Sequence, residues 1–148
     1  MRVALGSDHA GLALKDTIKA LLDGLDVQYE DFGTVSSQPV DYPDVAEAVS
    51  RAVVGGRAER GILICGSGIG MAIAANKIAG IRAAVVWDET SAQLSRAHND
   101  ANVMTLGGRT TLPDRAAAIV RVFLTTDFQG GRHGVRVAKI AQLERKDS

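Results

Sequence analysis

The chain alternates short runs of apolar residues with longer segments in which apolar residues recur every three or four positions. A short apolar run is typical of a buried strand, and the longer spacing is typical of an amphipathic helix. Turn residues separate each run from the helical segment that follows. Five apolar runs predict strands, at Val3–Leu5, Val27–Phe32, Ile62–Cys65, Arg82–Trp87 and Val103–Leu106.

The helical segments fall between and after these runs. Helices are expected after Gly11, from about Pro43, after the glycine loop at 66–70, over Ser91–Ala97, from Pro113 and over Val135–Arg145. Gly130 and Gly131 interrupt the pattern before the last helix. Three apolar residues of that helix, Val137, Ile140 and Ala141, are expected to face the protein interior.

Strands that alternate with amphipathic helices predict an α/β fold whose parallel sheet is covered on both faces. We expect a three-layer α/β/α sandwich with a five-stranded parallel sheet, Rossmann-like, that forms one domain over residues 1–148. Ligands of such folds bind beyond the carboxyl ends of the strands. The polar groups expected to gather at this edge are Asp8 and His9, Cys65 to Gly70, Asp88, and Gly107 to Arg109.

The amino-acid composition argues against two classes of binding partner, nucleic acids and membranes. Seventeen basic residues balance seventeen acidic ones, and aromatic residues are scarce and do not interleave with basic ones, so no nucleic-acid partner is expected. No apolar stretch approaches the roughly 20 residues of a membrane span, so no membrane partner is expected either. A single cysteine cannot form an intramolecular disulfide, and no apolar signal core opens the chain. We therefore expect a cytoplasmic protein.

Cys65 ends an apolar run and leads directly into the glycine loop Gly66-Ser67-Gly68-Ile69-Gly70, which a helical segment follows. A helix N-terminus favours the thiolate form of a nearby cysteine, and the glycines leave backbone N–H groups open to an oxyanion. A base beside such groups is typical of carbanion or enolate chemistry. The alternative interpretation is that Cys65 is a small buried hydrophobic residue.

The same glycines partly match the dinucleotide-binding fingerprint G-x-G-x-x-G. The third glycine of that motif would fall at Met71 instead of Gly70, so the register fails. Asp88, about 20 residues further on, is the one element that fits, because an acidic residue there can bind a ribose 2′-hydroxyl. A nicotinamide-linked enzyme is kept only as an alternative.

Basic residues gather near the start of the last helix, at Arg132, His133 and Arg136. Because a helix N-terminus disfavours cations, their position there indicates a bound anion such as a phosphate; a solvated surface patch is the alternative. His9 and His98 stand beside carboxylates or amides and are candidate general acids or bases. The three histidines also permit a metal site, although no established metal-binding spacing is present.

Six short motifs lie in order along nearly the whole chain. They are Ser7-Asp8-His9-Ala10-Gly11, Ile64-Cys65-Gly66-Ser67-Gly68-Ile69-Gly70, Ala74-Ala75-Asn76-Lys77, Ser91-Ala92-Gln93-Leu94-Ser95-Arg96, His98-Asn99-Asp100-Ala101-Asn102 and Gly131-Arg132-His133. Any one of them is a weak signal, but six in order are specific. Together they resemble the ribose-5-phosphate isomerase B family, which includes the galactose-6-phosphate isomerase subunits.

The resemblance implies an enzyme that interconverts an aldose phosphate and a ketose phosphate through a cis-enediolate, without a metal or an organic cofactor. It implies that Cys65 is the base at carbon 2, that His98 helps to open the sugar ring, and that the Ser67 hydroxyl shuttles protons. One branch of the family has a glutamate where this chain has Met71, so Cys65 is the only candidate base here. The implied substrate-binding groups are Asp8, His9, Gly66, Ser67, Gly68, Ile69, Gly70, Asn99, Arg109, Arg132 and Arg136.

The substrate and the assembly are also expectations from this resemblance. Ribose 5-phosphate is the expected substrate; the alternatives are a six-carbon sugar phosphate, such as allose 6-phosphate or galactose 6-phosphate, and a non-catalytic module that binds a nucleotide or a sugar phosphate. Members of the family form dimers whose sites draw residues from both chains. We therefore expect a homodimer, or a dimer of such dimers, in which Cys65 of one chain works with Arg132 and Arg136 of the other.

Overall fold

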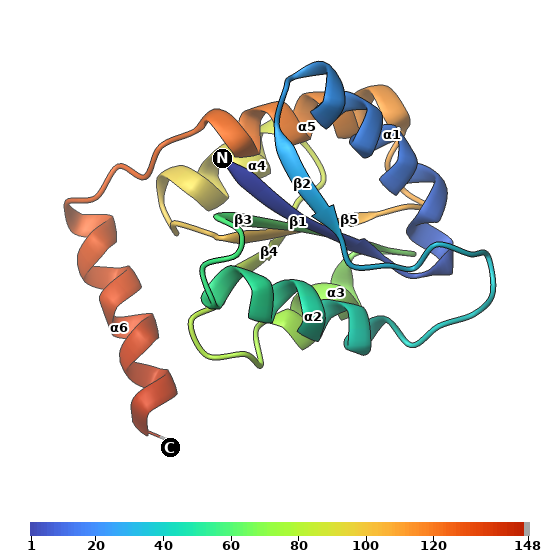
Figure 1. Ribbon diagram of the computed structural model, residues 1–148. Helices are drawn as coiled ribbons and strands as arrows, with labels where there is room; N and C mark the ends of the chain where they lie inside the picture. Colours follow the sequence, from blue (N-terminus) through green and yellow to red (C-terminus); the bar gives the residue numbers. More distant parts are fainter. Residues whose placement is uncertain (147–148) are drawn as a thin grey trace.

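A computed structural model describes residues 1–146 and shows a parallel sheet between two layers of helices (Figure 1). The five strands lie side by side in the order β2-β1-β3-β5-β4. Each neighbouring pair is parallel, so all carboxyl ends meet at one edge of the sheet. The predicted α/β/α fold is therefore confirmed. The strands are β1 (Arg2–Ser7), β2 (Gln28–Asp31), β3 (Arg60–Cys65), β4 (Ala83–Val85) and β5 (Val103–Gly107).

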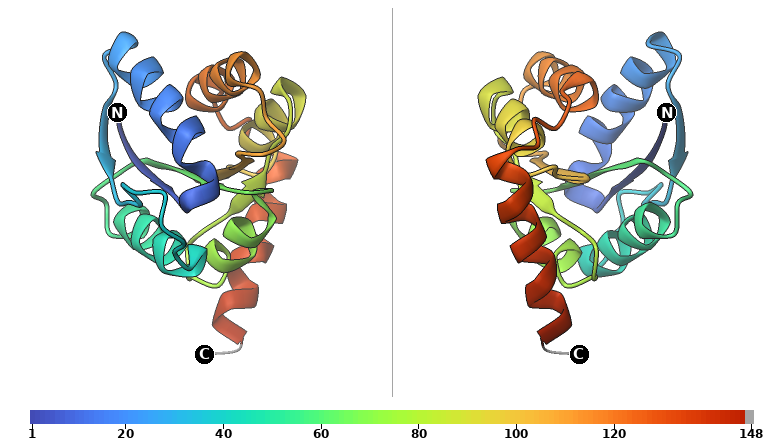
Figure 2. Two further views of the ribbon diagram at one scale, coloured as in Figure 1. Left: turned by 90° about the vertical axis from the view of Figure 1, so that its right-hand side faces the viewer. Right: turned by 90° about the vertical axis from the view of Figure 1, so that its left-hand side faces the viewer.

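The helices divide between the two faces of the sheet, as Figures 1 and 2 show. α1, α4 and α5 cover one face, and α2 and α3 cover the other. A short 3-10 turn, η1, joins β1 to α1. The bounds are η1 (His9–Gly11), α1 (Leu12–Gly24), α2 (Tyr42–Val54), α3 (Ile69–Ala75), α4 (Glu89–Ala97), α5 (Pro113–Thr125) and α6 (Arg132–Lys146).

Two hydrophobic cores lie on opposite faces of the sheet because successive strand residues point in opposite directions. On β3, Ile62 and Ile64 join the core beneath α1 and α5, whereas Leu63 and Cys65 join the core beneath α2 and α3. Both faces are buried, which explains why the central strands appear in the sequence as continuous apolar runs. Alternation along β3 also decides that the Cys65 side chain lies on the side of α2 and α3.

The predicted strand at 82–87 is shorter in the structure, because its last residues turn toward α4. Asp88 caps that helix: its carboxylate accepts a hydrogen bond from the Ser91 N–H at 2.6 Å, and the Ser91 hydroxyl accepts one from the Asp88 N–H at 3.2 Å. This reciprocal capping begins α4 at Glu89, two residues before the predicted start. Asp88 thus stabilises a helix end, which accounts for its position without a nucleotide.

α6 lies on the side of the molecule where the strands begin (Figure 1), and its Glu144 carboxylate accepts hydrogen bonds from the Gly80 N–H at 3.0 and 3.1 Å. Gly130 and Gly131, both with positive φ, turn the chain away from α5 before the helix starts. None of the described α6 residues is buried, and Ile140 is 43% exposed, so the expectation that Val137, Ile140 and Ala141 face the interior is wrong for the single chain. Even α6, the longest helix described, is unsuited to cross a bilayer, and the same holds for every other helix within residues 1–146.

Candidate active site

A cleft of about 650 Å³ opens at the edge of the sheet where the strands end. Its walls come from the turns that follow β1, β3 and β5, together with the first residue of α2 and the first turns of α3. Most of these groups belong to the edge that the sequence predicts. The lining residues are Asp8, Tyr42, Cys65, Gly66, Ser67, Ile69, Gly70, Ile73, Arg109 and Thr110.

Cys65 is the last residue of β3 and is 5% exposed. Its sulfur accepts a hydrogen bond from the Gly68 N–H, with an N···Sγ distance of 3.1 Å. Gly68 adopts φ +80°, a conformation that suits glycine, and α3 begins at the next residue. A backbone N–H aimed at the sulfur stabilises negative charge on it. The thiol therefore lies in surroundings that suit a proton acceptor.

The loop between β3 and α3 is held against the end of β5. The Thr105 hydroxyl donates to the Gly68 carbonyl at 2.7 Å, and the Arg109 N–H donates to the Gly66 carbonyl at 3.1 Å. The Arg109 guanidinium also lies over Gly66: a Cβ added to Gly66 would come within 3.2 Å of Nη1. The free N–H groups of the loop and this guanidinium make the cleft attractive to anions.

Asp8 lines the cleft just after β1, and His9 is the next residue along the chain. Asp8 is 6% exposed, and its Oδ1 accepts hydrogen bonds from the Ala10 and Gly11 N–H groups at 3.0 and 3.1 Å. His9 Nδ1 accepts a hydrogen bond from the Val40 N–H at 3.3 Å. Because Nδ1 is the acceptor, a neutral His9 carries its proton on Nε2. The cleft thus has an oriented carboxylate in its wall and an oriented imidazole on the adjoining residue.

Tyr42 is a lining residue that sequence reasoning missed. It is the first residue of α2, and its ring packs against Gly70: a Cβ at Gly70 would come within 2.5 Å of the ring carbon Cε1. Glycine at position 70 therefore allows the aromatic ring to close one side of the cleft. The proline that follows Tyr42 predicts a helix start but gives no signal of where the ring points. Ile73 and Thr110 were missed for the same reason, because their roles depend on tertiary contacts.

The other predicted site residues lie at the opposite edge of the sheet, where the strands begin. α4 runs back from the carboxyl edge, so His98, which caps its C-terminus, lies near the start of β5. The His98 ring stacks on His133 of α6, with ring centres 4.1 Å apart and an angle of 9° between the planes. Burial, the charge of His98 and the guanidinium groups of Arg132 and Arg136 lower the pKa of His133. Asn99 follows His98 and lines a separate groove between β4 and α6.

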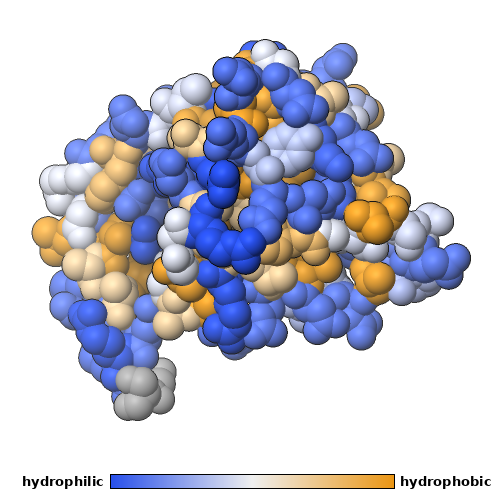
Figure 3. Space-filling view, in the orientation of Figure 1, coloured by the Kyte–Doolittle hydropathy of each residue, from blue (hydrophilic) through white to orange (hydrophobic). Residues whose placement is uncertain are grey.

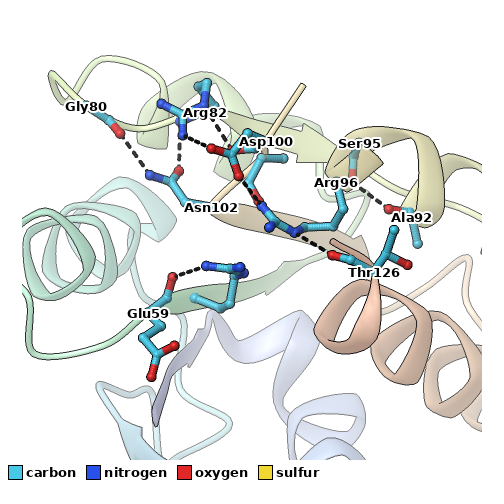
Figure 4. A network of polar contacts seen from close by, with 11 residues as sticks. Glu59, Gly80, Arg82, Ala92, Ser95, Arg96, Asp100, Asn102 and Thr126 are labelled. Carbon is cyan, nitrogen blue, oxygen red and sulfur yellow. Dashed lines mark hydrogen bonds and ion pairs between the residues drawn. The ribbon is translucent and has the colours of Figure 1, made fainter. Parts of the chain in front are cut away.

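A network of hydrogen bonds and ion pairs holds the turn that carries His98 and Asn99 (Figure 4). Arg96, 3% exposed, donates from Nη1 to the Asp100 carboxylate at 2.8 Å and to the Ala101 carbonyl at 2.7 Å. Arg82 Nε donates to the Asp100 carbonyl at 2.9 Å. The network fixes this turn, so the two polar side chains are presented from a rigid support.

The Cys65 cleft and the turn that carries His98 and Asn99 are too far apart to act together within one chain. The turn beyond Asn99 reaches the start of β3, where the Gly61 N–H donates to the Asn102 carbonyl at 2.8 Å, whereas Cys65 ends the same strand. The four residue steps from Gly61 to Cys65 span roughly 13 Å at about 3.3 Å per residue. His9 is likewise separated from His98 and His133. No group of three metal-ligating side chains occurs in the described part of the chain.

A buried thiol, a row of backbone N–H groups and a guanidinium meet at the carboxyl edge of a parallel sheet. This combination is typical of enzymes that move a proton on a small anionic substrate, because the thiolate can take the proton and the N–H groups can hold the resulting oxyanion.

Comparison with known proteins identifies the family. The ribose/galactose isomerase family model matches residues 3–140. Ribose-5-phosphate isomerase B of Escherichia coli (strain K12) is 48% identical over 145 residues, which cover 98% of this chain and 97% of that protein. This chain therefore belongs to the ribose/galactose isomerase family and is an aldose–ketose sugar-phosphate isomerase.

Solved structures agree with this assignment. Ribose-5-phosphate isomerase B of Clostridium thermocellum is similar with a TM-score of 0.99 and 48% identity, over 100% of both chains. The enzyme of Mycoplasma genitalium, solved with bound ribulose-5-phosphate, is similar with a TM-score of 0.93 and 39% identity, over 97% of this chain and 96% of that one. The family resemblance read from the sequence is confirmed.

Proposed function

We propose that this protein interconverts ribose 5-phosphate and ribulose 5-phosphate through a cis-enediolate, with Cys65 as the base. The observation that carries the proposal is the Gly68 N–H on the Cys65 sulfur, 3.1 Å away, at the head of the glycine loop. The thiolate takes the proton from carbon 2 of the open-chain aldose, and the electron pair moves through the new double bond onto the carbonyl oxygen at carbon 1. The thiol then returns the proton to carbon 1, which yields the ketose.

The loop stabilises the charge that this step creates. The N–H groups of the 66–70 loop that do not donate within it, those of Gly66, Ser67 and Gly70, hold the developing enediolate oxygen, and such donors contribute several kcal/mol in a site that excludes water. The Ser67 hydroxyl moves a proton between the two sugar oxygens. The Ile69 N–H donates to the Ser67 Oγ at 3.2 Å, which leaves that hydroxyl free to act as a donor.

The remaining groups bind the sugar and its phosphate. Asp8 and Asn99 bind sugar hydroxyls, and His98 assists ring opening by proton transfer. The anion-binding groups are His9, Arg109, Arg132 and Arg136. Arg109 lines the Cys65 cleft and His9 follows the lining residue Asp8, whereas the other two arginines stand near His98 at the far edge.

A symmetric homodimer places the carboxyl edge of the sheet of one chain, with Cys65, against the opposite edge of the other chain, with His98. In this arrangement the Cys65 cleft of one chain receives His98, Asn99, Arg132 and Arg136 of the other, and symmetry makes both sites equivalent. The separation of these groups within one chain supports it. So does the exposed apolar surface of α6, where Val135, Ile140 and Leu143 are 61, 43 and 58% exposed. Figure 3 shows orange and tan apolar surface on the α6 side of the molecule.

An isomerase assay over five- and six-carbon sugar phosphates tests the proposed substrate. The expected result is the highest kcat/KM with ribose 5-phosphate. Six-carbon phosphates are the second candidate, because the matching family model includes galactose isomerases. Higher kcat/KM with allose 6-phosphate or galactose 6-phosphate would replace ribose 5-phosphate as the substrate. Tight binding of a phosphosugar or nucleotide without any turnover would indicate a non-catalytic module.

Metal removal is expected to leave the isomerase activity unchanged. Within residues 1–146, His, Cys, Asp and Glu side chains do not gather in threes that could bind a metal ion, and the proposed proton transfers need only protein groups. The measurement is kcat and KM after prolonged dialysis against EDTA. Loss of activity that an added divalent metal restores would contradict this prediction.

A further inference from the structure

Lys15 is the most deeply buried charged side chain among residues 1–146, at 1% exposure. Lysine is almost never buried to this degree unless it is paired. Its ammonium donates to Asp31 Oδ1 at 2.8 Å and also to the backbone carbonyl of Thr34. Lys19, one turn further along α1, reaches the other carboxylate oxygen at 3.2 Å but is one-third exposed.

The Lys15 contacts join two segments that adjoin lining residues of the Cys65 cleft. Lys15 lies in the first turns of α1, directly after the η1 turn that contains His9. Thr34 lies in the connection between β2 and α2, where its N–H donates to the Ser7 carbonyl at 2.6 Å. The part of that connection from 34 to 41, the 34–41 loop, ends beside Tyr42 in the cleft wall. Near its far end, this loop supplies the Val40 N–H that His9 Nδ1 accepts. The lysine thus ties α1 to the near end of the loop, and His9 ties η1 to the far end.

Hydrogen bonds favour the ionised form of the Asp31 carboxylate. Burial raises the pKa of Asp31, but hydrogen bonds from Lys15, the Gly33 N–H and Lys19 outweigh that effect and lower it. A buried ion pair is seldom more stabilising than apolar residues of the same volume. Fold stability alone therefore does not account for a lysine here, whereas the directed contact with the Thr34 carbonyl does, because an apolar side chain cannot make it.

We propose that Lys15 is a positioning residue for the cleft. By holding the Thr34 carbonyl, it fixes the 34–41 loop so that the Val40 N–H stays on His9 Nδ1. The neutral imidazole then keeps its proton on Nε2, where it can donate to an anionic substrate. The kinetic consequence rests on the proposed isomerase function, but the structural consequence does not.

The test compares Lys15→Met with Lys19→Met. Both variants remove one ammonium from Asp31, but only the first removes the contact with the Thr34 carbonyl. In Lys15→Met we expect exchange of the Val40 amide to accelerate about tenfold, in line with the loss of one hydrogen bond. The ¹⁵N chemical shifts of His9 should move away from the Nε2–H signature, and kcat/KM should fall mainly through KM. Lys19→Met should leave the Val40 exchange rate, the His9 shifts and kcat/KM at wild-type values.

A double variant separates positioning from stability. Removal of Lys15 alone leaves a less compensated carboxylate, which destabilises the fold. Lys15→Met combined with Asp31→Asn removes both charges, so the thermal midpoint should recover while the Val40 amide still exchanges fast. Exchange of the Val86 amide, which is bound to the Thr105 carbonyl in the sheet, serves as the reference for global stability.

Three outcomes would overturn the proposal. The first is a folded Lys15→Met variant with wild-type Val40 exchange and His9 shifts. The second is wild-type kcat/KM in that variant despite fast exchange. The third is an equal effect from Lys19→Met. If the wild-type protein isomerises none of the sugar phosphates, the proposed function fails, but the exchange rates and histidine shifts still decide the role of Lys15.

Discussion

Replacement of Cys65 by alanine is expected to lower kcat about 10³-fold, within the range that a general base contributes. Substrate binding should change little, because the glycine loop and the basic side chains that hold the phosphate remain. The measurement is steady-state kcat and KM with ribose 5-phosphate, with direct titration of ribose 5-phosphate as a check on binding. A kcat close to that of the wild type would eliminate Cys65 as the base.

Alkylation supplies an independent control for this prediction. Cys65 is the only cysteine in the chain, so iodoacetamide should attach one label per chain and abolish activity. Bound sugar phosphate should slow both labelling and inactivation to the same extent. The Cys65→Ala variant should take up no label. Labelling that leaves activity intact would contradict the proposed role of the thiol.

Replacement of Arg132 and Arg136 by alanine is expected to raise KM about 10- to 100-fold for each arginine, since a hydrogen bond to a charged group contributes about 1.5–3 kcal/mol. The double variant should also lose its preference for phosphorylated over free sugars, while kcat falls much less. The measurement is kcat/KM for ribose 5-phosphate and for ribose.

Arg145→Ala is the matched control for these variants. It removes the same type of side chain from the same helix, but helical spacing places it on the face opposite Arg132 and Arg136. Its KM and sugar selectivity should equal those of the wild type. If all three arginines behave alike, Arg132 and Arg136 act only as part of a basic surface.

Local sequence patterns predicted the sheet and the cleft that contains Cys65. A strand, a glycine loop and a helix follow one another directly at Cys65, so the geometry of that segment depends on neighbouring residues. The parallel sheet then brings Asp8 and Arg109 to the same edge, as the fold class predicts. These features need little information about distant contacts.

Features that depend on distant contacts were not predictable. Tyr42 closes the cleft only because Gly70 leaves space for its ring. The burial of Lys15 depends on Asp31 and Thr34, which the sequence pattern of α1 does not reveal. α6 has the apolar spacing of a packed helix, yet within one chain none of its described residues is buried. In our proposal its partner surface belongs to the second chain, which the sequence indicated only through the resemblance to a family of dimers.

Mixed dimers test the central claim, that each site combines Cys65 of one chain with Arg132 and Arg136 of the other. A Cys65→Ala chain is mixed with an Arg132→Ala/Arg136→Ala chain under conditions that allow subunit exchange, and differently tagged chains prove that exchange occurs. A mixed dimer then contains one intact site and one doubly damaged site. We predict that activity rises to about half of the wild-type value per mixed dimer. No recovery despite proven exchange would contradict the account, because each site would then be built within a single chain.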